Sequence, residues 1–279
     1  MNRLIEAVIL RAARPYFAGT VLEDALRLAT EAGARGYPVT LCYWNAPDDP
    51  ADRIAKHYDA VIDAIVRTGL DAHMAIKVPP FAKKPELIGD VLARARAQGI
   101  AVDIDSHAPA EAEMDYATAA AAAPEGLGIA IPGRWASSPS LADRAVELGL
   151  RVRVVKGQWD DPEAPDIDLG EGFLAVIDRL AGRCREVGVA THDIPLAREA
   201  IRRLTAAGTQ AEQELLFGLP MDASTEAARQ AGLNTRIYIA YGEAWIPYSI
   251  GGAIRHPRTM VRFVTDLATG HRDGLPKPA

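Results

Sequence analysis

Short apolar runs rich in β-branched residues alternate with longer amphipathic stretches along nearly the whole chain. Continuous apolar runs of this kind, bounded by turn residues, are typical of strands that are buried on both faces. The pattern predicts strands at residues 38–43, 72–77, 100–105, 127–132, 151–156, 187–191, 212–216 and 235–239.

Between these runs, apolar residues recur at the spacing of a helix that packs one face on a core. The pattern predicts helices at residues 22–34, 51–67, 84–98, 140–147, 172–186 and 195–206. Several of them end near a glycine suited to the left-handed C-cap position, namely Gly36, Gly69, Gly99, Gly149, Gly188 and Gly208.

Strict alternation of strands and helices implies parallel strands joined by right-handed crossovers. Eight predicted strands in this order favour an α/β fold, a closed (β/α)8 barrel of the TIM type. An open doubly wound sheet is the alternative, but no G-x-G-x-x-G follows the first predicted strand, where a dinucleotide would need it. The barrel is therefore the preferred architecture.

The chain of 279 residues, 49% of them hydrophobic, is long enough for one such barrel domain. We expect an amphipathic N-terminal helix at residues 1–14, the barrel at about 15–268 and a frayed tail at 270–279. The acidic, proline-punctuated run at 160–168 is expected to be a solvated loop after the fifth strand.

The composition of the chain indicates which class of partner it binds and in which compartment it lies. The net charge is −6 and the 31 Lys and Arg residues are scattered, which argues against a nucleic-acid partner and favours a small molecule. Only Cys42 and Cys184 are present, so a reducing cytoplasm fits better than a disulfide framework. No run is long enough to predict a transmembrane segment, and peripheral attachment at a membrane is left open.

Several predicted strands end in reactive side chains, and the carboxyl ends of barrel strands form the active site of this fold. These side chains are Lys77, Asp105, Arg153 and Lys156, the run Thr191-His192-Asp193, and the pair Glu212 and Glu214. An unpaired guanidinium is expensive to bury, so Arg153 needs an anionic or electron-rich partner. The plain alternatives are a structural ion pair of Arg153 with Asp105 or Glu212, and a structural hydrogen-bonded role for His192.

Taken together, these residues resemble the motifs of the proline dehydrogenase family. Residues 153–157, RVVKG, resemble R-L-V-K-G, and residues 190–193, ATHD, resemble A-T-H-N/D. Residues 212–218, EQELLFG, resemble the end of F-E-F-Q-x-L-Y/H-G, and residues 236–252 resemble R-x-Y-x-P-Y-G-E-x-W-x-P-Y-x-x-R-R. The resemblance runs from Pro15 to about Phe263.

The resemblance implies a proline dehydrogenase-like barrel that binds FAD and oxidises a C–N bond. It implies catalytic roles for Lys77, Asp105, Arg153 and Tyr238, and FAD contacts from Arg153, Lys156, Gly157, Gln158, Trp159, Thr191, His192, Asp193 and Glu212. It implies substrate contacts from Lys77, Tyr238, Tyr248, Gly251, Gly252 and Arg255. We predict no metal ion.

The departures from the family pattern gather on the substrate side. Gly251 and Gly252 replace the arginine pair that holds the carboxylate of proline. Cys42 replaces an aspartate, Pro132 replaces a glutamine, and Trp159, preceded by Gln158, takes the place of the aromatic residue after K-G-A. Losing two charge-assisted contacts of roughly 1.5 to 3 kcal/mol each weakens a carboxylate ligand by about two to four powers of ten.

The favoured prediction is a flavin-dependent dehydrogenase that acts on an amine or proline-like substrate other than free proline, with a quinone or oxygen as the electron acceptor. One alternative is an ordinary proline dehydrogenase, in which Arg255 reaches back to the carboxylate. Another is a Schiff-base lyase or aldolase that uses Lys77 or Lys156. The last is a barrel without catalytic activity.

Overall fold

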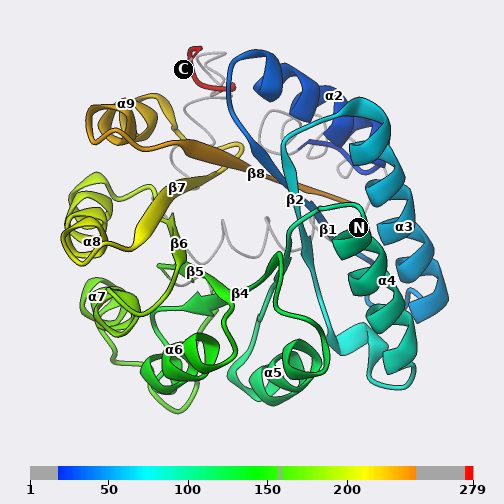
Figure 1. The fold of residues 1–279 in the computed structure, drawn as a ribbon, viewed down its shortest axis with the longest axis horizontal. Helices are drawn as coiled ribbons and strands as arrows, with labels where there is room; N and C mark the ends of the chain where they lie inside the picture. The colour runs from blue at the N-terminus through cyan, green and yellow to red at the C-terminus, as the bar shows by residue number, and fades with distance from the viewer. Residues whose placement is uncertain (1–17, 157–158, 243–273, 279) are drawn as a thin grey trace, which may run out of the picture.

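The computed structural model describes residues 18–156, 159–242 and 274–278. Its parallel strands close into a barrel in the order of the sequence, from β1 to β8 and back to β1 (Figure 1). The strands are β1 (Val39–Tyr43), β2 (Ala72–Ile76), β3 (Val102–Ile104), β4 (Leu127–Pro132), β5 (Arg151–Val155), β6 (Glu186–Ala190), β7 (Gln210–Leu216) and β8 (Thr235–Tyr241). The predicted barrel is confirmed.

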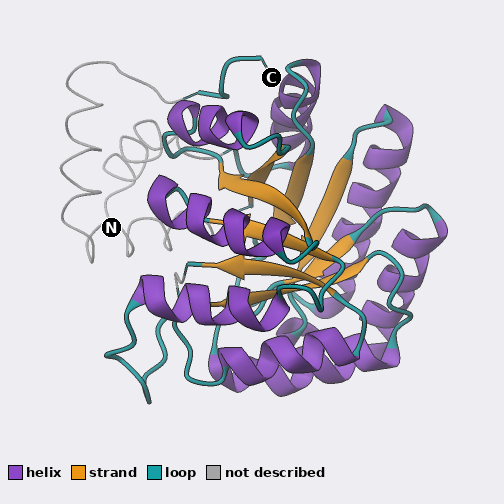
Figure 2. Ribbon diagram, turned by 60° about the vertical axis from the view of Figure 1, so that its left-hand side comes forward, coloured by secondary structure: helices purple, strands orange, loops and turns teal. Residues whose placement is uncertain are grey.

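Helices surround the barrel on its outside (Figures 1 and 2). They are α2 (Leu22–Ala34), α3 (Ala51–Thr68), α4 (Pro85–Ala97), α5 (Ala112–Ala121), α6 (Ser138–Glu147), α7 (Leu169–Leu180), α8 (Ile194–Ala206) and α9 (Asp222–Gln230). The short 3-10 helices η2 (Pro79–Phe81) and η3 (Pro109–Glu111) precede α4 and α5. The sequence pattern predicts six of the α-helices and misses α5 and α9 as separate elements.

The helix predicted at 172–186 is wrong at both ends. It begins at Leu169, because the Asp168 side chain accepts hydrogen bonds from the backbone N–H groups of Gly170 and Glu171. It ends at Leu180, and Gly182 follows with φ 73°, a conformation that glycine adopts without strain. Gly188, predicted as the glycine that ends this helix, instead lies inside β6.

The two faces of the barrel strands carry different chemistry. In β5, Val152 and Val154 are fully buried in the main hydrophobic cluster, which also contains the inner faces of the helices. Arg151 and Arg153 alternate with them and form ion pairs with residues of β3 and β7, which are not neighbours of β5 in the sheet. Such pairs can form only across the inside of the barrel, so its interior is charged where many barrels are aliphatic.

Residues near the C-terminus lie against the start of the barrel. The Arg35 guanidinium donates hydrogen bonds to the backbone oxygens of Leu275 at 2.8 Å and Pro276 at 3.0 Å. The Tyr37 hydroxyl donates one of 2.6 Å to the backbone oxygen of Lys277. Residues 275–277 are therefore docked, in contrast to the frayed tail that the sequence predicts.

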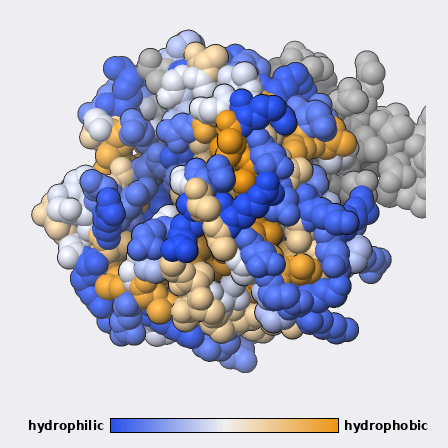
Figure 3. All heavy atoms as spheres, turned by 45° about the vertical axis from the view of Figure 1, so that its right-hand side comes forward, coloured by the Kyte–Doolittle hydropathy of each residue, from blue (hydrophilic) through white to orange (hydrophobic). Residues whose placement is uncertain are grey.

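On the face of the molecule seen in Figure 3, hydrophobic residues lie among hydrophilic ones. An apolar cavity of about 490 Å³ lies between α4 and α5, lined by Val78, Phe81, Ile88, Leu92 and Met114 among others. It lies outside the barrel and away from the interior charges. None of the helices in the described part of the chain is long and apolar enough to cross a membrane.

Candidate active site at the carboxyl ends of the strands

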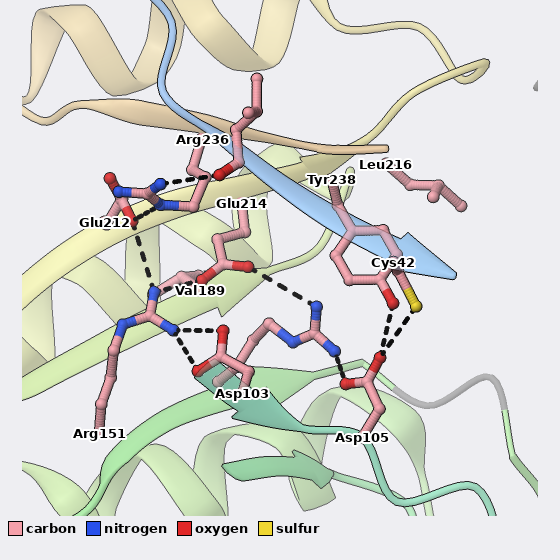
Figure 4. A network of polar contacts seen from close by, with 12 residues as sticks. Cys42, Asp103, Asp105, Arg151, Val189, Glu212, Glu214, Leu216, Arg236 and Tyr238 are labelled. Atoms are coloured by element: carbon pink, nitrogen blue, oxygen red, sulfur yellow. Dashed lines mark hydrogen bonds and ion pairs between the residues drawn. The ribbon is translucent and has the colours of Figure 1, made fainter. Parts of the chain in front are cut away.

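The half of the barrel interior nearer the amino ends of the strands, here called the lower half, contains Arg151, the first residue of β5. The charged residues of this half surround its side chain. Its guanidinium donates to both carboxylate oxygens of Asp103, at 2.9 and 3.0 Å (Figure 4). It also donates to Glu186 at 2.9 Å. It also forms ion pairs with Glu214 and, at 3.4 Å, with Glu212. Four carboxylates around one buried guanidinium fix β3, β5, β6 and β7 relative to one another.

Two glycines leave room for Arg151 to reach across its neighbouring strands. A Cβ at Gly128 in β4 would meet the Asp103 carboxylate, and a Cβ at Gly188 in β6 would meet the Glu214 carboxylate and lie 3.0 Å from Arg151 Nη2. A side chain at position 188 would therefore displace the ion pair between Arg151 and Glu214. The C-cap role predicted for Gly188 is incorrect for this reason.

Arg153 lies one step further along β5 and is the centre of the upper layer. It forms an ion pair with Asp105, at the end of β3, and lies 3.9 Å from Glu214 of β7. Its guanidinium also lies 4.5 Å from the ring centre of Tyr238 in β8. Burial disfavours the charged form, but Asp105, Tyr238, Glu214 and Asp103 together outweigh it and raise the pKa of Arg153 further above its usual range.

Asp105 joins three strands in this layer. The Tyr238 hydroxyl donates to Asp105 Oδ2 at 2.5 Å, while Arg153 binds Oδ1 (Figure 4). Cys42 in β1, at the position where the family has aspartate, directs its Sγ toward the same oxygen at 3.9 Å. Burial raises the pKa of the Cys42 thiol to about 11, so this position carries no charge at neutral pH.

Lys77 directly follows β2 and faces the same region as Asp105 and Cys42. Its ammonium lies 4.2 Å from the ring centre of Trp44, which directly follows β1. In the described ranges 18–156, 159–242 and 274–278, no carboxylate lies within ion-pair distance of this ammonium. Burial lowers the pKa of Lys77 because the charged form loses water, and Asp105 and Glu111 only partly oppose it.

Three aromatic side chains meet above this layer, from the loops that follow β1, β3 and β5. The His107 and Trp159 rings are stacked with centres 4.2 Å apart, and Trp44 lies 5.8 Å from His107 and 6.4 Å from Trp159. Trp159 also packs on the small cluster that contains Cys42 and Tyr238. Trp44 and His107 were not predicted as site residues, since neither matches a motif.

Lys156 follows β5 and Asp193 follows β6, so both lie at the carboxyl ends of these neighbouring strands. Their side chains form an ion pair of 2.6 Å, which lowers the pKa of Asp193. Asp193 also caps α8 by accepting from the backbone N–H of Leu196, and the Thr191 hydroxyl accepts from the backbone N–H of Asp193. The predicted site residues Lys156, Thr191 and Asp193 thus lie together.

His192 has a clear structural role. Its Nε2 accepts a hydrogen bond from the backbone N–H of Leu216 at 3.0 Å, so its Nδ1 carries the proton and donates to the backbone oxygen of Pro220 at 3.0 Å. Both ring nitrogens therefore fasten the loop after β7 to β6. This agrees with the structural alternative considered for this histidine.

Glu212 does not lie with the other described residues predicted to contact the cofactor. Glu212 pairs with Arg236 at 2.7 Å and with Arg151, in the lower half of the barrel, away from the strand ends where Lys156 and Thr191 lie. Its neighbour on the same face, Glu214, is the one that approaches Arg153. Gly157, Gln158, Tyr248, Gly251, Gly252 and Arg255 lie outside the described residues.

The loop that carries Trp159 is fastened to the loop after β4. The Trp135 indole donates to the backbone oxygen of Trp159 at 3.0 Å, and Arg134 forms an ion pair of 2.5 Å with Asp160. The buried Asp161 carboxylate accepts from the backbone N–H of Ala136 at 3.0 Å. Most residues of the acidic run at 160–168 are exposed, as expected for a solvated loop, and the run is anchored at its start by Arg134–Asp160 and by Asp161.

Comparison with known proteins agrees with the motifs. No protein-family model matches the chain. Proline dehydrogenase 2 of Bacillus subtilis (strain 168) is 26% identical over 106 residues, which cover 35% of this chain and 34% of that protein. The barrel resembles proline utilization A (PutA) from Bdellovibrio bacteriovorus inactivated by N-propargylglycine, with a TM-score of 0.74 and 14% identity over 96% of this chain.

A second solved structure, PutA from Corynebacterium freiburgense, has a TM-score of 0.70 and 18% identity, and the match covers 100% of this chain. These matches cover only 34% and 36% of the two PutA chains, so the chain spans about a third of their length. The chain is thus similar in sequence to a proline dehydrogenase over about a third of its length, and it shares the barrel fold of PutA.

Proposed function

We propose that the protein is an FAD-dependent dehydrogenase that oxidises a C–N bond of an amine or proline-like substrate. One observation carries the proposal most directly. Arg153 is buried where the charged interior meets the strand ends, held by Asp105 and Glu214, and its Nε has no hydrogen-bond partner among the described residues. A buried donor that the protein leaves unpaired is expected to have a partner outside the described residues, and a bound cofactor is one.

The other residues at this end of the barrel fit a flavin dinucleotide. Lys156 is only half-buried and supplies a positive charge at the ends of β5 and β6, where an anionic diphosphate needs one. Thr191 adds a hydroxyl beside it. When bound, FAD accepts a hydride from the substrate carbon. Glu212, placed in the lower half of the barrel, has no part in this proposal.

The chain's own residues supply position and charge. The Arg153 guanidinium, kept charged by Asp105, stabilises negative charge that develops on a reduced electron acceptor beside it. Tyr238 is fixed by its hydrogen bond to Asp105 and forms a wall of the site. Burial of Lys77 and the stacked rings above it keep water away from the reacting carbon.

Free proline is not the preferred substrate in this proposal. A carboxylate would have to rely on Lys77, whose ammonium already lies over Trp44, because Gly251 and Gly252 stand where the family has arginines. Binding through Arg255 is the competing arrangement. The electron acceptor, a quinone or oxygen, and a cytoplasmic location with possible attachment at a membrane are further parts of the proposal.

The purified protein tests the flavin directly. We expect a yellow protein whose absorption bands disappear when an amine substrate is added without oxygen. Arg153→Ala should lose flavin or slow its reduction, while Arg202→Ala, which removes an arginine from the outer surface of α8, should keep both. A colourless wild-type protein that takes up no FAD contradicts the proposal, and so does an Arg153→Ala variant with unchanged flavin content and reduction rate.

The lowered pKa of Lys77 favours a Schiff-base lyase as the second candidate, because a neutral amine is the form that attacks a carbonyl. Borohydride would then trap a carbonyl substrate on Lys77, in a protein without flavin absorption. The Lys77→Met variant should abolish that trapping. A yellow protein in which Lys77 is not modified excludes this candidate.

A further inference from the structure

The rings of Trp44, His107 and Trp159, here called the aromatic wall, are the most distinctive feature of the strand ends. They come from loops after β1, β3 and β5 and lie with their centres 4.2 to 6.4 Å apart. Trp44 is buried, whereas His107 and Trp159 are half-buried, so aromatic surface remains accessible beside Lys77. Ring distances in this range are those of favourable aromatic contacts.

The aromatic wall carries no charge of its own. Burial lowers the pKa of His107 to about 2, and the charges of Lys77 and Arg153 lower it in the same direction. The imidazole is therefore neutral at physiological pH. Lys77 lies 4.2 Å from the ring centre of Trp44, and Trp159 packs on the cluster that contains Tyr238, whose ring centre lies 4.5 Å from Arg153. Both cations therefore lie at the same end of the barrel as the aromatic wall.

The aromatic wall is held in place by the protein. The Trp135 indole binds the backbone oxygen of Trp159, and Asp161 binds the loop after β4 at Ala136. In the loop after β3, the backbone N–H of His107 donates to Glu111 at 3.0 Å. Fixed rings lose little conformational freedom when a ligand stacks on them, which increases the affinity for a flat ligand.

We infer that the aromatic wall selects the substrate, and that the part of the substrate which does not react is a neutral, planar aromatic or heteroaromatic ring. This inference rests on the proposed function, because it names the class of amine that the same site accepts. The positive charges of Lys77 and Arg153 repel a ligand that carries a second positive charge besides its amine. A carboxylate finds two described cations in this layer, but the Lys77 ammonium is desolvated and lies over Trp44, and the Arg153 guanidinium is paired with Asp105.

The inference is tested by binding, independently of turnover. Tetrahydroisoquinoline, a cyclic secondary amine with an aromatic ring, is compared with its saturated counterpart decahydroisoquinoline by calorimetry on the protein as purified. We expect the aromatic amine to bind more tightly, by roughly 2- to 10-fold for each ring contact. Trp44→Leu and Trp159→Leu should reduce this preference toward equality, and Trp44→Phe should retain most of it.

Phe81→Leu is the matched control, because it removes a buried aromatic ring that lies against Tyr58 on the outer side of the barrel. It should leave the preference unchanged. Equal affinity of the two amines for the wild type overturns the inference, even if FAD is present and reduced by an amine. Loss of FAD from Trp44→Leu with an unchanged preference among amines also overturns it, because the aromatic wall would then hold the cofactor.

Different results would contradict the proposed oxidation of an amine and the inference about an aromatic ligand. A protein that lacks flavin but binds the aromatic amine through Trp44 keeps the inference about the ligand and removes the proposed oxidation. A yellow protein that is reduced equally well by pyrrolidine, proline and tetrahydroisoquinoline keeps the proposed function and removes the inference.

Discussion

Tyr238 and Asp105 are joined by a hydrogen bond of 2.5 Å from the tyrosine hydroxyl to Oδ2, although 133 residues separate them in the sequence. The other oxygen of Asp105 binds Arg153. The tyrosine ring in turn lies 4.5 Å from the Arg153 guanidinium. Because each residue contacts the other two, they are expected to act as a unit and their substitutions to be non-additive.

Replacing Asp105 tests this unit. Asp105→Asn removes the charge that holds Arg153 and should slow flavin reduction by about 10- to 100-fold, the equivalent of one charge-assisted hydrogen bond of roughly 1.5 to 3 kcal/mol. Tyr238→Phe should have a smaller effect, and the double variant should be no slower than Asp105→Asn alone. Stopped-flow reduction without oxygen measures all three, and fully additive effects would contradict the coupling.

Arg151 is expected to support stability and not chemistry, because it lies in the lower half of the barrel. Arg151→Met leaves Asp103 and Glu214 buried without their main partner, which is expected to cost about 3–5 kcal/mol. Arg151→Lys should lose less, since one positive charge remains. Urea unfolding followed by circular dichroism measures the free energy of unfolding of both variants.

The free energy of unfolding of Arg151→Met should also depend on pH differently from that of the wild type. In the wild type, burial would raise the pKa of Asp103, but the charge and hydrogen bonds of Arg151, together with His73 and Arg153, outweigh burial and lower it. The stability from this pair is therefore present at neutral pH and lost as pH falls through the lowered pKa. Without Arg151 the buried carboxyl prefers its proton, so the difference between variant and wild type should shrink between pH 7 and pH 4.5. A constant difference would show that lost packing, and not charge, is responsible.

The sequence predicts the barrel well because strands buried on both faces and amphipathic helices leave strong periodic patterns. It misses α9 because the buried positions of that helix are Ser224, Thr225 and Ala228, which give no apolar periodicity. The charged strand residues are visible in the sequence, and the pairing of Arg153 with Asp105 was one of the alternatives considered, but the partners of Arg151 were not predicted. Arg151 reaches Asp103 across β4 only because the barrel closes and Gly128 has no side chain.

The aromatic wall shows the same limit at the candidate site. Trp159 could be identified from its place after a cofactor-like motif, whereas Trp44 and His107 follow strands in loops that match no motif. Only closure of the barrel brings the three loops together. A useful signal would have been that each ring follows an inward-facing residue at a strand end by only a few positions, since such positions point to the mouth of the barrel.

Asp115 in α5 should lower stability at neutral pH. Burial raises its pKa to about 7, and only Oδ2 has a hydrogen bond, from the Ser106 hydroxyl at 2.5 Å. Since the folded protein holds this proton more tightly than the unfolded chain, stability falls as pH rises from about 4 to about 7. Asp115→Asn should flatten this part of the profile and raise the free energy of unfolding at pH 7.5 by roughly 1 to 3 kcal/mol.

Thermal unfolding between pH 4 and pH 8 measures this effect. Asp90→Asn, on the exposed face of α4, is the control and should follow the wild type. An Asp115→Asn variant that keeps the fall in stability between pH 4 and pH 7 would assign that fall to another group.

The rate of flavin reduction should rise with pH. Hydride transfer requires a neutral amine lone pair, so an ammonium substrate must first lose its proton. Rates measured without oxygen should increase toward the pKa of the amine itself, and this midpoint should move when an amine of different pKa is used. A flat profile from neutral to alkaline pH would argue against transfer from the neutral amine.

The final prediction follows from Gly251 and Gly252, which replace two arginines of the family motif. If the substrate lacks a carboxylate at this place, the wild type should reduce its flavin faster with prolinamide than with proline. The double variant Gly251→Arg, Gly252→Arg should reverse this order, because two guanidinium groups favour a carboxylate by about two to four powers of ten. Lys77→Met in both backgrounds shows how much the remaining cation contributes. Efficient oxidation of free proline by the wild type, abolished by Arg255→Ala, would instead identify an ordinary proline dehydrogenase that binds the carboxylate through Arg255.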